Sequence, residues 1–148
     1  MATTAPNSYL RDAVMTATPE QLQLMLYDGA IRFASQARDA IVAGDYETSY
    51  EKLSRAQAIM IEMESGLRRD VNADLCERMA AIYGFLYRKL VEASVNKDTA
   101  AIDDALKVLR MERETWVLLL DKINTARAQA GTADPQQTSE HCSLCVEG

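Results

Sequence analysis

The sequence predicts an all-α protein: an antiparallel, up-down-up-down four-helix bundle with a short N-terminal helical arm and a disordered C-terminal tail. Apolar residues recur at steps of three and four along four long segments, and short links rich in Gly, Asn or Asp separate these segments. No alternating run of β-branched residues typical of a strand occurs. Short links require neighbouring helices to run antiparallel. We expect residues 1–18 to form the arm, 19–127 the bundle and 128–148 the tail.

The arm is predicted from residues 8–15, where Tyr9, Leu10, Ala13 and Val14 lie at helical spacing. A helix of two turns is not stable alone in water, so this segment either docks on the bundle or frays. Two interpretations remain open: a movable cover over a binding groove, or a packed N-terminal extension.

The first long helix is expected over residues 19–43. Thr18 can cap its start, and Gln21 completes a capping box. Gly29 lies inside the helix at a cost of about 1 kcal/mol relative to alanine, which indicates close backbone packing or contact with another molecule. Two apolar strips run along this helix, one with Leu22, Met25, Leu26, Ala30, Phe33 and Ala37, the other with Leu24, Ile31 and Ala34.

Three further helices are expected over residues 46–65, 73–95 and from 98 or 99 to about 127, each beginning near a capping Asp or Asn. The inward positions of the first are Tyr46, Ser49, Leu53, Ala56, Met60 and Met63. Those of the second are Leu75, Met79, Ile82, Leu86 and Ala93, with Cys76, Tyr83, Tyr87 and Leu90 at the margin. Those of the third are Ile102, Leu106, Leu109, Trp116, Leu120 and Ile123.

Composition excludes several classes of protein. The chain of 148 residues carries a formal net charge of −6, which argues against nucleic-acid binding and against anionic membrane surfaces. No apolar run approaches the roughly 18 residues that a membrane span needs, and no signal peptide is visible, so we expect a cytoplasmic protein without membrane insertion. The three cysteines do not form the disulfide framework of a small secreted protein.

Catalytic and cofactor chemistry also lack the residues they need. The only histidine is His141, in the tail, so a di-iron carboxylate bundle, a histidine-ligated haem and a Ser/His/Asp set are excluded. With Cys142 and Cys145 it offers three soft ligands, one fewer than a closed zinc site requires. A zinc site shared by two copies and an incidental tail both remain open. Acid–base chemistry by paired carboxylates stays open for Glu62, Glu64, Asp103, Asp104, Glu112 and Glu114, although carboxylates on helix faces are usually solvated. We predict no enzyme and no cofactor.

One contiguous block carries a family resemblance. Residues 18–33 read Thr-Pro-Glu-Gln-Leu-Gln-Leu-Met-Leu-Tyr-Asp-Gly-Ala-Ile-Arg-Phe. This block, with Tyr9 upstream and residues 56–59 and Trp116 downstream, resembles the flagellar secretion chaperone FliS family. The resemblance implies a cytoplasmic chaperone that binds the C-terminal region of newly made flagellin, prevents premature polymerisation and helps to deliver it to the flagellar export apparatus.

The apolar and aromatic surplus of the helices exceeds what one four-helix seam can hide, which indicates a partner surface. We expect an amphipathic client segment to fold into an apolar groove. The predicted contacts on the bundle are Leu24, Met25, Tyr27, Ile31 and Met60. Tyr9, Leu10 and Val14 of the arm are expected to occupy part of the groove in the free protein, a role that the resemblance implies for Tyr9. The alternative is a structural bundle that forms a homodimer and has no client.

Overall fold

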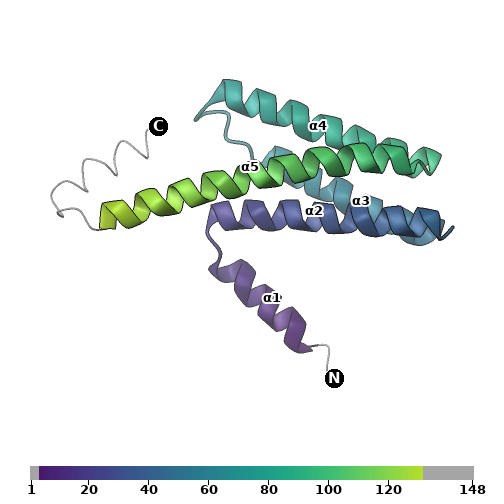
Figure 1. Cartoon of the computed structure of the whole chain (residues 1–148), viewed down its shortest axis with the longest axis horizontal. Helices are drawn as coiled ribbons and strands as arrows, with labels where there is room; N and C mark the ends of the chain where they lie inside the picture. The colour runs from purple at the N-terminus through teal and green to yellow at the C-terminus, as the bar shows by residue number, and fades with distance from the viewer. Residues whose placement is uncertain (1–3, 132–148) are drawn as a thin grey trace.

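The structure, a computed structural model, describes residues 4–131 and consists of five helices (Figure 1). They are α1 (Thr4–Thr16), α2 (Pro19–Val42), α3 (Tyr46–Ser65), α4 (Ala73–Asn96) and α5 (Thr99–Gly131). The described residues contain no strand, which confirms the all-α prediction. The predicted tail beyond residue 131 lies outside the described residues.

Four of the helices form a bundle in which each packs against two neighbours. Helix α2 packs against α3 and α5, and α4 also packs against α3 and α5. Successive helices run in opposite directions (Figure 1). This arrangement confirms the up-down-up-down bundle, and it leaves α2 and α4 diagonal to each other across the core.

The start of α2 follows the capping pattern predicted from the sequence. The Thr18 side chain accepts a hydrogen bond from the backbone N–H of Gln21 at 3.2 Å, and the Gln21 side chain accepts one from the backbone N–H of Thr18 at 2.9 Å. At the other end Gly44 adopts a φ of 76°, in the left-handed region that glycine tolerates best. These residues fix both ends of the helix.

The later helices begin where expected and end with small differences. Asp45 and Asn72 cap α3 and α4 through hydrogen bonds to the backbone N–H of the third helical residue. Lys97 closes α4 in a left-handed conformation, with a φ of 53°. Helix α5 continues to Gly131 instead of ending near Arg127, because no helix-breaking residue precedes Gly131 in this segment.

Small residues let α2 approach its neighbours closely. Ala30, Ala34 and Ala37 are fully buried. A Cβ placed on Gly29 would lie 3.3 Å from Cδ1 of Ile59 on α3, which is tighter than ordinary van der Waals contact. Close packing between helices, the first of the two explanations given for Gly29, is therefore the one that the structure supports.

The inward face of α4 differs from the sequence prediction. Leu75, predicted to point inward, is more than half exposed, whereas Cys76, Tyr83 and Leu90, predicted at the margin, are buried. Helix α4 carries apolar residues around more than one stripe, so spacing alone does not fix which stripe faces the core. Tyr46 at the start of α3 is also half exposed, with the Lys97 ammonium 5.6 Å from its ring centroid.

Candidate docking surface

Two of the predicted contact residues lie in the core. Tyr27 and Met60 are each 1% exposed. Tyr27 precedes Ala30 by three residues and Ala34 by seven, which places it on the buried stripe of α2 and not on the outer strip. The burial of Tyr27 corrects its placement on an exposed contact surface, whereas Met60 lies where its predicted inward position on α3 puts it.

Leu24, Met25 and Ile31 are partly buried. Ile31 packs against the core, and Leu24 lies two turns earlier on the same side of α2. This side faces α5, because Asp28 between them forms an ion pair with Arg113. Leu24 and Ile31 therefore belong to the seam between α2 and α5.

Further polar contacts close the same seam. The indole N–H of Trp116 donates to the backbone oxygen of Glu20 at 2.8 Å. Near the other end of α2, the Arg38 guanidinium contacts the Asp103 carboxylate at 2.6 Å. Polar contacts thus join α2 and α5 near both ends of the seam that contains Leu24 and Ile31.

The arm does not cover the bundle in this structure. Helix α1 leaves the start of α2 and points away from the other helices (Figure 1). Tyr9 is 80% exposed, and Leu10 and Val14 are also exposed. In this structure, contrary to the prediction, the three side chains therefore do not occupy a groove of the free protein.

Exposed apolar side chains instead gather on the outer side of α3. Tyr50 is 64% exposed and Ile61 is 56% exposed. Ser54 and Ala58 lie between them at steps of three and four, so all four residues share one face of the helix. Small side chains flanked by two large ones give this face an uneven, partly hollow surface.

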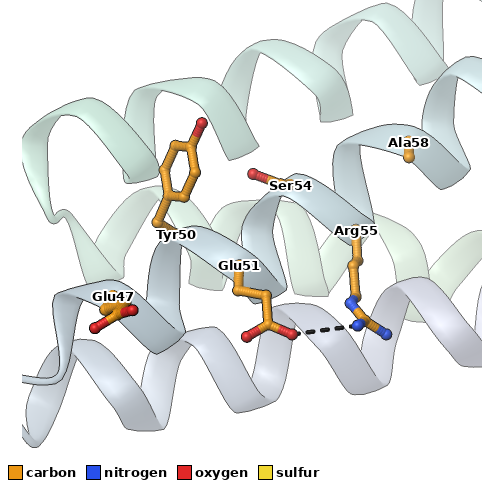
Figure 2. Close-up of a pocket in the computed structure, with 6 residues that line it drawn as sticks. All are labelled: Glu47, Tyr50, Glu51, Ser54, Arg55 and Ala58. Carbon is orange, nitrogen blue, oxygen red and sulfur yellow. Dashed lines mark ion pairs between the residues drawn. The ribbon is translucent and has the colours of Figure 1, made fainter.

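Figure 2 shows the hollow on this face of α3. It is lined by Glu47, Tyr50, Glu51, Ser54, Arg55 and Ala58. The Tyr50 ring rises on the side of α4, whereas Glu51 and Arg55 point to the side of α2 and form an ion pair at 3.2 Å. The hollow thus has an aromatic edge and a charged edge.

A second hollow lies one turn further along, between α3 and α4. It is lined by Met60, Ile61, Glu64, Gly84, Tyr87 and Arg88. Gly84 contributes no side chain there, and a Cβ at this position would meet only Nη1 of Arg88 at 3.5 Å. We name the surface formed by Tyr50, Ser54, Ala58, Ile61, Gly84 and Tyr87 the α3–α4 face.

The α3–α4 face was not among the predicted binding surfaces. Tyr87 was predicted at the margin of its helix, and neither Tyr50 nor Ile61 was among the predicted contacts. One feature of the sequence could have indicated this surface. The spacing of Tyr50 and Ile61 places both on a side of α3 outside the stripe of Leu53, Ala56 and Met60.

Residues 4–131 contain no group of three metal-binding side chains and no histidine. Burial raises the pKa of Glu112, which acts electrostatically on the buried hydroxyls of Tyr27 and Tyr83. None of the helices in this part of the chain is long and apolar enough to cross a membrane.

A family model for the flagellar protein FliS matches residues 1–123. The chain belongs to the FliS family. It is similar to the flagellar secretion chaperone FliS of Bacillus subtilis, with 37% identity over 109 residues that cover 74% of this chain and 80% of the relative. The FliS of Salmonella typhimurium is 31% identical over 108 residues, which cover 72% of this chain and 80% of that protein.

Comparison with solved structures supports the same fold. A crystal structure described as a flagellar chaperone from bacteria superposes with a TM-score of 0.67 at 18% identity, covering 82% of this chain and 99% of the other. Membership of the FliS family makes this chain a flagellar secretion chaperone, and it confirms that the chain is not an enzyme.

Proposed function

We propose that this FliS-family protein is a cytoplasmic export chaperone that binds the C-terminal region of flagellin. In this role it prevents premature polymerisation and assists delivery of flagellin to the flagellar export apparatus. Support comes from the relatives, which are named flagellar secretion chaperones. The sequence block at residues 18–33, which resembles this family, gives flagellin as the client.

We place the client on the α3–α4 face. The observation that carries this placement is the exposure of Tyr50 and Ile61 on one face of α3, beside a hollow that continues to Tyr87 and Gly84 on α4. Large exposed apolar side chains that share one face and flank surface hollows are candidates for a partner site. An amphipathic segment folding as a helix would set its apolar side chains into the two hollows at steps of three and four.

Binding of this kind protects the client from self-association and still allows the client to be released. The client buries apolar side chains that would otherwise pair with other flagellin molecules. Ordering a disordered segment consumes about 2–5 kcal/mol of the gross contact energy, which keeps the complex reversible. Neither step needs catalysis or a nucleotide.

Isothermal titration calorimetry with a peptide of the flagellin C-terminal region tests the proposal. Replacing both Tyr50 and Ile61 by serine is expected to weaken binding more than tenfold, because exposed aromatic and aliphatic anchors carry much of the energy of such interfaces. The matched control replaces Met111 and Leu118 by serine. Both are more than half exposed, but they lie on α5. Equal affinity of the Tyr50/Ile61 variant and the wild type would refute this placement.

The alternative function, a homodimer without a client, has a separate test. Size-exclusion chromatography with light scattering gives the mass of the protein with and without the flagellin peptide. A monomer that gains the mass of one peptide supports the chaperone proposal. A dimer of unchanged mass supports the alternative.

A further inference from the structure

Three cations surround one aromatic ring where α2 meets α3. The guanidinium carbon of Arg32 lies 5.2 Å from the ring centroid of Phe33, that of Arg55 lies 5.6 Å away, and the Lys52 ammonium lies 5.7 Å away. Arg32 and Phe33 belong to α2, whereas Lys52 and Arg55 belong to α3. We call these four residues the Phe33 cluster.

The charge of this cluster is poorly compensated. Arg55 has one carboxylate partner, Glu51, at 3.2 Å, and both side chains are more than half exposed. Such a pair contributes little to stability. Arg32 and Lys52 form no ion pair with any residue in the range 4–131. Positive charge therefore collects at one place on a chain whose net charge is −6.

At Phe85, by contrast, the cation beside the aromatic ring is paired with carboxylates. The Lys89 ammonium lies 5.9 Å from the ring centroid of Phe85, comparable to the distances around Phe33. Lys89 also contacts Glu92 at 3.5 Å and Asp104 at 3.7 Å. The chain thus supplies two carboxylates to a single cation at Phe85, but only one to the three cations at Phe33.

We infer that the client segment carries acidic side chains beside an apolar residue, and that these carboxylates bind the Phe33 cluster. Two observations support this occupant. Guanidinium groups bind carboxylates through paired hydrogen bonds, and Phe33 at the centre is only partly buried. Arg55 and Glu51 also line the hollow on α3, so a client on the α3–α4 face reaches the cluster without leaving the surface. The inference rests on the proposed function.

Other anionic partners fit the molecule less well. A nucleic acid or an anionic membrane presents an extended negative surface, which a chain of net charge −6 repels as a whole. A short acidic peptide segment places its charge only where the cations are. The client is therefore expected to be recognised by local complementarity.

The test compares two charge-neutralising double variants, titrated with the flagellin C-terminal region at low and high salt. Replacing Arg32 and Lys52 by glutamine is expected to weaken binding about fivefold to tenfold at low salt, and to reduce the loss of affinity that salt causes in the wild type. The control replaces Arg78 and Lys107 by glutamine. These two residues are exposed, lie on α4 and α5, and form no ion pair with other described residues, so wild-type affinity is expected.

A flagellin variant with its C-terminal Asp and Glu changed to Asn and Gln completes a double-mutant cycle. It is expected to bind the wild-type chaperone and the Arg32/Lys52 variant equally well, because the contact is already lost. Unchanged client affinity of the Arg32/Lys52 variant would overturn the inference. A loss with Tyr50→Ser and Ile61→Ser in the same assay would still uphold the proposed function. Binding of DNA or phosphatidylserine vesicles that needs Arg32 and Lys52, with the client unaffected, would also overturn it.

Discussion

The hydroxyl oxygens of Tyr27 on α2 and Tyr83 on α4 lie 3.2 Å apart inside the core. The Gln23 side-chain amide donates a further hydrogen bond to the Tyr83 oxygen at 3.0 Å. Because α2 and α4 are diagonal helices, this chain of hydrogen bonds joins two elements that do not otherwise share a long seam. A buried polar link of this kind fixes the relative position of the helices it connects.

Removing the hydroxyl of Tyr27 or that of Tyr83 is expected to destabilise the bundle, and the two removals are expected to differ in their cost. Tyr83→Phe leaves both Tyr27 and Gln23 without this partner and is expected to cost about 2 kcal/mol, whereas Tyr27→Phe is expected to cost about 1 kcal/mol. The double variant is expected to cost less than the sum, because it leaves no buried hydroxyl unpaired. Urea unfolding followed by circular dichroism measures all three, and strict additivity would contradict the coupling.

The same pair makes stability sensitive to alkaline pH. Burial raises the pKa of both Tyr27 and Tyr83 above the ordinary value of 10.0. The unfolded chain therefore releases these protons first as the pH rises, so the stabilisation is complete below pH 10 and declines above it. Between about pH 9 and about pH 11 the wild type is expected to lose more stability than the Tyr27→Phe/Tyr83→Phe variant. Parallel pH profiles would contradict this account.

Two glycines within helices are expected to respond to substitution in opposite directions. Gly84→Ala is expected to stabilise the protein by about 0.5–1 kcal/mol, because an added Cβ meets only the end of Arg88. Gly29→Val is expected to destabilise it by about 1–3 kcal/mol, since even a Cβ comes within 3.3 Å of Ile59. Thermal unfolding of both variants measures the contrast. A stabilised Gly29→Val variant would show that α2 and α3 can separate at little cost.

The helices and their order were predictable from the sequence because their signals are local. The Thr18 capping box depends only on neighbouring residues and appears as predicted, and Gly44 just beyond α2 takes the left-handed conformation that ends the helix. The buried stripe of α3 also followed its spacing, apart from Tyr46 at its first turn. Local chemistry thus determined where helices begin and end.

The docking surface was not predictable in the same way, because it depends on which of two apolar strips each neighbouring helix covers. Tyr27 was predicted to contact the client although it is buried against Tyr83 of α4, and Tyr50 was not predicted as a contact although it is 64% exposed. The Phe33 cluster combines residues from two helices, so neither segment shows it alone.

Deleting residues 1–15 tests the role of the arm. The deletion retains Thr18 and Gln21, which cap α2, and removes the exposed side chains of Tyr9, Leu10 and Val14. Since α1 does not pack along the bundle, the free energy of unfolding is expected to change by less than about 0.5 kcal/mol. Urea unfolding measures this change.

The same deletion variant, titrated with the flagellin peptide, distinguishes two functions of the arm. With α1 held away from the α3–α4 face, as in this structure, the affinity for the peptide is expected to equal that of the wild type. Tighter binding would mean that the arm covers the groove in solution and competes with the client, since removing a competitor raises the fraction of protein that is competent to bind. Weaker binding would mean that Tyr9 or its neighbours contact the client directly. A variant with Tyr9→Ser alone would then locate the contact.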